Sequence, residues 1–173
     1  MKNIAKSLVI AAIAIVSANS SFAQATATAS ASATIITPIT IAKTVDMNFG
    51  NVAVSATLAG TVVLSPASGR TTGGAGGVTL PATVGTVAAA SFTVSGQANY
   101  TYAITLPSTA TITDAGSHTM TVNGFTSTPS ATGTIGAGGS QTLTVGATLN
   151  VTAGQSAGTY TNASGVPVTV NYN

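Results

Sequence analysis

The sequence predicts an all-β fold, and more closely an antiparallel β-sandwich of about nine strands. Short segments with period-2 alternation of apolar and polar residues recur along the chain, and turn residues separate them. The composition supports this prediction, because Thr, Val, Ser and Gly dominate and Glu is absent, which leaves little material for an amphipathic helix. A closed barrel is the alternative architecture for the same pattern.

The clearest strands lie between Ser140 and Asn173. The first has an apolar face that consists of Leu143, Val145, Ala147, Leu149 and Val151. The second has an apolar face that consists of Val166, Val168, Val170 and Tyr172. Because this alternation is typical of strands that bury one face, Leu149 and Val168 are expected in the core. The sequence ends inside the second strand, which we expect at a sheet edge or against a neighbouring molecule.

The middle of the chain supplies the other predicted strands. Thr34–Ala42 is expected to be a strand in which Pro38 marks an edge or a bulge. Ala88–Ser95 and Tyr100–Leu106 are predicted to form a hairpin, with Tyr100 and Tyr102 on a core face. Further strands are expected at Thr61–Leu64, at Thr109–Thr113 and from Met120 onward, with a kink at Gly124. Pro66–Gly77 and Ser127–Gly139 are predicted to be loops.

The first 23 residues have the features of a secretory signal peptide helix. Lys2 and Lys6 flank the start of a short apolar run, Leu8–Val16, and Ser21-Phe22-Ala23 provides the small residues that signal peptidase requires. This run is too short to span a bilayer comfortably, and no later run is long enough for a transmembrane helix. We therefore expect cleavage before Gln24 and export to the periplasm, the cell surface or the medium.

The mature chain begins with a low-complexity extension, Gln24–Ala33, ahead of a predicted β domain at residues 34–173. Alanine alternates with Thr or Ser in this extension, at Ala25, Ala27, Ala29, Ala31 and Ala33. The same odd-numbered phase continues through Ile35, Ile39 and Ile41. The extension can form a strand with one small apolar face, or it can remain a flexible linker.

Charge is sparse in the mature chain. After cleavage it keeps Lys43, Arg70, Asp46 and Asp114, so that its net charge is zero. Nothing in this balance suggests a nucleic acid or an anionic membrane as a partner. A near-neutral surface repels its own copies weakly, which favours self-association. The chain has no cysteine, so its core must stabilise the fold without disulfides.

The residues suited to catalysis are few, and we expect a non-catalytic protein without a cofactor or a metal. Asp114 and His118 lie close in sequence, and Gly154-Gln155-Ser156-Ala157-Gly158 matches the Gly-x-Ser-x-Gly pattern, but no helix is expected after this serine, as a nucleophile elbow requires. A turn aspartate followed by an exposed histidine is the favoured interpretation of this pair. The acidic and histidine residues are too few for a metal site, and the two aspartates are not placed like a glycosidase pair.

An ordered set of short segments gives the chain a family resemblance. These segments are the Ala/Thr-rich start, Pro38–Ile41, Phe49-Gly50, Gly60–Ser65, Phe92–Gly96, Ile104–Pro107, Val145–Leu149, Gly158–Tyr160 and Val168–Asn173. In this order they resemble the domain-of-unknown-function family 4402, which consists of exported bacterial proteins common in Gram-negative species. That family is similar to the fimbrial-adhesin group of immunoglobulin-like sandwiches, which includes chaperone–usher pilins.

The resemblance implies an immunoglobulin-like sandwich that serves as a structural subunit of a surface fibre and assembles by β-strand addition. It also implies self-association and a periplasmic chaperone as partners, because the N-terminal extension of one pilin fills the missing-strand gap of the next. The candidate assembly residues that follow from it are Ala25, Ala27, Ala29, Ala31, Ala33, Val168, Val170 and Tyr172. Tyr172 stands where pilins have a tyrosine, next to the end of the chain.

Two features depart from pilins and bear on assembly more than on the fold. The chain lacks the pilin disulfide, and its alanines are smaller than the bulky side chains of many donor strands. The alternative function is a stand-alone secreted or outer-surface binding or adhesion module, with carbohydrate as the candidate ligand.

The signal peptide gives a first testable prediction. We expect the exported protein to begin at Gln24, because signal peptidase cleaves after small residues such as those of Ser21-Phe22-Ala23. Intact-mass spectrometry of the exported protein measures this directly. Retention of residues 1–23 in that protein would contradict the prediction.

Overall fold

The computed structural model describes residues 24–173, and the predicted signal peptide at residues 1–23 lies outside them. Residues 36–173 form one compact unit, and residue 35 is the last residue of a separate N-terminal unit. All regular structure in the described residues is β, with fourteen strands and antiparallel pairing throughout. The predicted all-β class is therefore confirmed.

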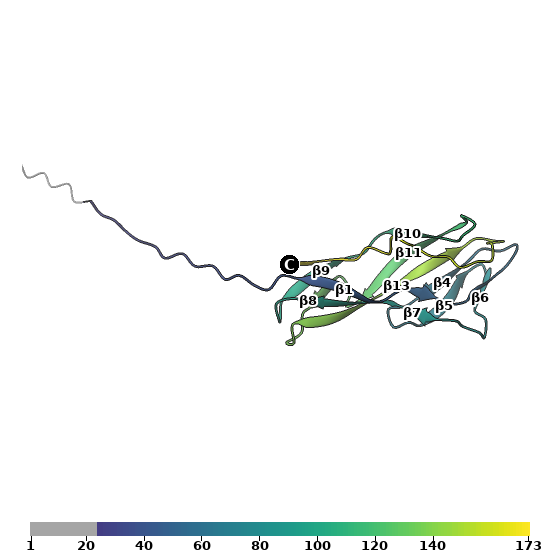
Figure 1. Cartoon of the computed structure of the whole chain (residues 1–173), viewed down its shortest axis with the longest axis horizontal. Helices are drawn as coiled ribbons and strands as arrows, with labels where there is room; N and C mark the ends of the chain where they lie inside the picture. The colour runs from purple at the N-terminus through teal and green to yellow at the C-terminus, as the bar shows by residue number, and fades with distance from the viewer. Residues whose placement is uncertain (1–23) are drawn as a thin grey trace, which may run out of the picture. The chain divides into compact units, whose positions relative to one another are not determined.

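The largest sheet has seven strands and is organised around the long strand β13 (Figure 1). Its main path consists of β1 (Thr40–Val45), β8 (Ala90–Ser95), β13 (Ser140–Val151), β11 (Thr119–Thr128) and β10 (Thr109–Thr113). Two more strands, β4 (Gly60–Leu64) and β5 (Arg70–Gly74), extend the sheet beside the second half of β13. One edge of β13 therefore pairs first with β8 and then with β4, while its other edge pairs with β11.

Three smaller sheets complete the structure. A three-stranded sheet has the order β12 (Thr132–Thr134), β9 (Thr101–Thr105) and β14 (Thr169–Tyr172). Two pairs of two-residue strands join β2 (Asn48–Phe49) to β7 (Val87–Ala88) and β3 (Ala53–Val54) to β6 (Val78–Thr79).

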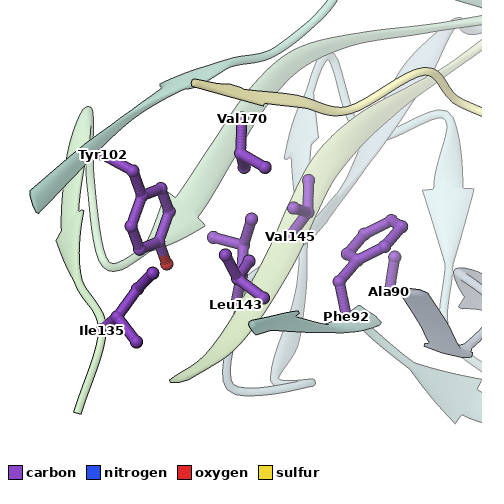
Figure 2. Close-up of a cluster of buried hydrophobic side chains, with 8 residues drawn as sticks. Ala90, Phe92, Tyr102, Ile135, Leu143, Val145 and Val170 are labelled. Carbon is purple, nitrogen blue, oxygen red and sulfur yellow. The ribbon is translucent and has the colours of Figure 1, made fainter. Parts of the chain in front are cut away.

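The three-stranded sheet packs on the seven-stranded sheet through a buried apolar cluster. Figure 2 shows Phe92, Leu143 and Val145 facing Tyr102 and Val170, and Tyr102 is fully buried. A second cluster lies under the other half of β13 and contains Val62, Val78, Val122, Ala147, Leu149 and Val151. The apolar residues of β13 are at most 3% exposed, which confirms the alternation predicted for this strand.

The strand count exceeds the prediction of about nine, because several strands are too short or too polar to produce an alternation signal. β2, β3, β6 and β7 have two residues each, and β12 has three. β5 and β12 occupy segments that were predicted to be loops, and β5 pairs with β4 although both its central threonines are exposed. Thr34–Ala42 was predicted to be a strand, but β1 begins only at Thr40.

The predicted hairpin between Ala88–Ser95 and Tyr100–Leu106 is wrong, because β8 and β9 belong to different sheets. The connection crosses from one sheet to the other, and Asn99 adopts a positive φ of 65° within it. Phe92 and Tyr102 can then bury their rings in one cluster from opposite sides. Tyr100 precedes β9 and is 45% exposed, so its predicted core position is also wrong.

The predicted kink at Gly124 is confirmed. The register of β11 against β13 shifts between Asn123 and Thr126, which marks a bulge. Gly124 has a φ of 58°, a value that glycine adopts without steric cost.

Burial in β13 leads to a stability prediction. Leu149→Ala is expected to lower the free energy of unfolding by roughly 2–5 kcal/mol, because it removes a 3% exposed side chain and leaves a cavity. Val63→Ala is the control, since the Val63 side chain is 40% exposed and its truncation should lower the free energy of unfolding by less than about 1 kcal/mol. Urea denaturation of both variants measures the difference. Equal losses would mean that the core is placed incorrectly.

Candidate functional site

The C-terminal strand β14 has one paired edge and one open edge. It pairs with β9 and lies at the end of the three-stranded sheet. The main-chain N–H of Asn173 donates to the carbonyl of Thr101 at 3.3 Å, and the register places Thr169 opposite Thr105. Because hydrogen-bonding groups alternate sides along a strand, the N–H and C=O groups of Val170 and Tyr172 face the open edge.

The pairing of β14 with β9 ends where two prolines would face each other. Extending the register beyond Thr169 and Thr105 places Pro167 opposite Pro107. Neither proline has an N–H, so this position cannot form a hydrogen-bonded pair. The predicted strand from Val166 to Tyr172 is accordingly shortened to β14, and Val166 and Val168 are only half-buried.

The segment Val166–Val168 lacks main-chain partners. Within residues 24–173, the main chains of Val166 and Val168 make no hydrogen bond. The side chain of Val168 packs on the cluster that contains Val170, so its side chain is anchored although its main chain is not. Val168 was predicted to be a core residue, and it lies at the margin of the core instead.

A groove of about 1430 Å³ lies beside this segment. One wall is formed by residues 155–168 and the other by the segment that connects β1 to β3, including Met47 and Val52. The floor consists of inward-facing side chains of β10, β11 and β13, among them Ile112, Val122 and Leu149. The groove is larger than the 300–1,000 Å³ that is usual for small-molecule sites.

The wall formed by residues 155–168 is fixed at its far end. The main chains of Thr113 and Thr161 exchange two hydrogen bonds, at 2.8 and 3.0 Å. The hydroxyl of Tyr160 donates to the carbonyl of Ser156 at 2.8 Å and accepts from the Gln155 amide at 2.9 Å. This part of the wall is therefore positioned by its own contacts, while Val166–Val168 is left unpaired.

Tyr172 connects the other end of β14 to the start of β1. Its hydroxyl accepts from the main-chain N–H of Gln97 at 2.6 Å and donates to the carbonyl of Thr37 at 2.7 Å. Its ring meets that of Tyr100 edge-on, with centroids 5.9 Å apart. Gly96 lies under the hydroxyl, where a Cβ atom would collide with it. Glycine is therefore needed at this position for the tyrosine to reach both partners.

The candidate assembly residues fall into two groups. Val168, Val170 and Tyr172 lie together along the C-terminal segment. The five alanines, Ala25, Ala27, Ala29, Ala31 and Ala33, belong to the separate N-terminal unit, in which residues 24–35 form no strand and have exposed side chains. The opposite wall of the groove was missed, because its two-residue strands give no periodic signal.

Asp114 and His118 form a pair that closes a turn. The ring Nδ1 of His118 lies 2.8 Å from Oδ2 of Asp114, and its main-chain N–H donates to Oδ1 at 2.8 Å. Hydrogen bonding to the His118 side chain holds the pKa of Asp114 below its ordinary value. In the part of the chain described here, no hydroxyl hydrogen-bonds to the His118 ring, and no three potential metal ligands cluster. The pair as it stands orders the turn.

Comparison with known proteins gives one match. The model of a family described as a domain of unknown function (DUF4402) matches residues 39–172. No curated protein and no solved structure matches the chain. Among the described residues there is no helix long and apolar enough to cross a membrane.

The hydroxyl of Tyr172 gives a second stability prediction. Tyr172→Phe is expected to cost about 1–2 kcal/mol of unfolding free energy, because the N–H of Gln97 loses its acceptor. Tyr100→Phe is the matched control, since within residues 24–173 the Tyr100 hydroxyl makes no hydrogen bond and the residue is 45% exposed. Chemical denaturation compares the two losses of one hydroxyl. A cost for Tyr100→Phe as large as that for Tyr172→Phe would contradict the assignment.

Proposed function

We propose that this chain, which belongs to the DUF4402 family, is an exported, non-catalytic structural subunit that assembles by β-strand addition. The N-terminal extension, Gln24–Ala33, of one copy adds to the open edge of β14 in the next copy. The receiving domain is an immunoglobulin-like sandwich whose second layer lacks one strand. The product is a fibre at the bacterial surface.

The open edge of β14 is the observation that carries this proposal. The main chains of Val166 and Val168 are unpaired within residues 24–173, and their side chains are half-buried. The main chain of Val170 faces the open edge, and its side chain is buried. Soluble proteins protect exposed strand edges, because such edges pair readily with other chains. Here Val166 and Val168, which lead into this edge, line a groove with an apolar floor, and this favours the addition of one strand over protection by charge or by a bulge.

The composition of the extension suits the donor role. Alternating alanines give one small apolar face, and the intervening Thr and Ser residues give a polar face. Main-chain hydrogen bonds supply the attraction in strand addition, so bulky side chains are not needed at every position. When each subunit donates to the next, the contact is heterologous and grows into a filament.

Export is consistent with this role and brings a further partner into the proposal. The predicted signal peptide would deliver the chain to the periplasm with its acceptor edge open. An open edge is an aggregation hazard before assembly. A periplasmic chaperone that covers the edge temporarily is therefore part of the proposal.

A stand-alone binding module is the second candidate function. The observation in its favour is the exposed ring of Tyr100, which packs edge-on against Tyr172. Exposed aromatic rings provide flat apolar platforms that suit sugar rings. If the chain is a binding module, we expect a monomer that loses carbohydrate binding in the Tyr100→Ala variant. If it is a structural subunit, we expect the Tyr100→Ala variant to assemble like the wild type.

Removal of the donor tests the proposed function. Deleting Gln24–Ala33 from the mature protein is expected to leave a monomer, because each acceptor edge loses its added strand. Analytical ultracentrifugation measures size in solution, and electron microscopy of cells shows surface fibres. As a control for length, a Gly/Ser linker replaces the same residues and should also fail to assemble. Oligomers and fibres that persist in both variants would contradict strand donation.

A further inference from the structure

We propose that the donor segment extends to Ile35, and that the Ile35 side chain anchors it in the groove of a second copy of this chain. This inference rests on the proposed function, because it names the acceptor site and the anchoring residue of the same assembly. Its two elements are the exposed side chain of Ile35 and a groove that has an apolar floor and unpaired main-chain groups on both walls.

Ile35 is an unusual residue to expose. It is 96% exposed, more than any other large apolar side chain among the described residues. Isoleucine is among the residues most often buried, although single exposed apolar residues do occur. Ile35 also shares the odd-numbered phase of the alanines, so that in an extended strand its side chain falls on their face. The small apolar face of the extension therefore ends in one large side chain.

The groove can hold a strand on both sides. On one wall, the main chains of Val166 and Val168 make no hydrogen bond within residues 24–173. On the other, the main chains of Met47 and Val52 are likewise free of hydrogen bonds in the described region. A single extended segment between these walls can bond to both of them, as an inner strand does in a sheet. Its inward side chains would meet the apolar floor.

The charges around the groove favour an uncharged occupant. Lys43 and Asp46 are the charged residues in its lining, and they pair with each other at 2.5 Å. No charge in the lining is therefore left to attract a charged peptide or ligand. The segment Ala25–Ile35 is uncharged and about 36 Å long when extended, which suits a groove larger than small-molecule sites.

We assign the occupant to a second copy, because the chain's own segment is tethered next to Tyr172. The carbonyl of Thr37 is held by Tyr172, so Ile35 can lie at most about 7 Å from that point. The groove lining begins at Lys43, in the second half of β1, so the chain's own segment would have to double back alongside β1 to enter the groove. Insertion into a neighbour requires no such reversal.

The first test compares substitutions at exposed apolar positions in the mature protein. Ile35→Ser is expected to weaken self-association by roughly 10- to 100-fold, as follows from losing the burial of one isoleucine. Ile35→Val should retain most of the affinity. Val84→Ser is the matched control, because Val84 is 51% exposed and lies outside the groove lining. Sedimentation velocity over a concentration series measures all four proteins.

The second test locates the anchor by cross-linking. The chain has no cysteine, so an engineered pair reports one contact. Protein carrying Ile35→Cys is mixed with protein carrying Val168→Cys or Val52→Cys under mild oxidation, and Val63→Cys on the exposed side of β4 is the control. We expect disulfide-linked dimers with at least one groove variant and about tenfold fewer with the control.

The outcomes separate this inference from the proposed function. If Ile35→Ser assembles like the wild type, or if Val63→Cys cross-links as well as both groove variants, the anchoring inference is overturned. Strand donation by the alanines can still stand in that case, and the deletion of Gln24–Ala33 decides it. If the wild type is monomeric at every concentration, the proposed function fails and the inference fails with it.

Discussion

The loss of hydrogen-bonding capacity at Pro107 and Pro167 determines the architecture around the groove. The register of β14 on β9 would bring these two residues together, and neither can donate. The three-stranded sheet therefore ends at Thr105 and Thr169. After Pro107 the chain enters β10 of the seven-stranded sheet, and before Pro167 it runs without a strand partner. The second layer is incomplete beyond this point, and the groove occupies the space.

The two halves of the core differ because of this incomplete layer. Where the three-stranded sheet covers β13, the cluster contains fully buried Tyr102, Leu143 and Val145. In the other half, Val122 and Leu149 are buried, but the residues that pack over them are only partly so, including Met47 and Phe49. Apolar area left accessible here is worth roughly 25 cal/mol per Å² when covered. This half of the molecule is where association with another chain would add most stability.

The sequence predicted those features of the fold that depend on the residue pattern within one strand. It did not predict those that depend on pairing between segments far apart in the chain. The alternation in β13 predicted its buried face, and Gly124 predicted the kink that the structure shows as a bulge in β11. The groove wall around Met47 and Val52 could not be predicted, because two-residue strands have no period to detect. The hairpin prediction failed for a related reason: a short turn permits pairing within one sheet or a crossing to the other. Tertiary packing of Phe92 and Tyr102 decides between these outcomes.

The open edge of β14 shows how far sequence alone can go toward a site. Alternation placed Val168, Val170 and Tyr172 on one face, and the structure adds that Val170 and Tyr172 turn their main-chain groups away from β9. What the alternation could not show is the interruption at Pro167, because a single proline is compatible with an edge strand. Only the opposing Pro107, sixty residues earlier in the chain, makes the interruption obligatory.

A repetitive donor raises a problem of register that one large side chain can solve. In the segment Ala25–Ala33, a shift of two residues replaces each alanine by another alanine, so the alternation specifies the pairing register weakly. Main-chain hydrogen bonds do not distinguish these registers either, because every register satisfies them equally. A single isoleucine on the same face would break this degeneracy, since shifting the register moves a large side chain to a different place on the groove floor, and packing is sensitive to such changes in volume. The alanines would then supply length and hydrogen bonds, while Ile35 would fix where the strand stops.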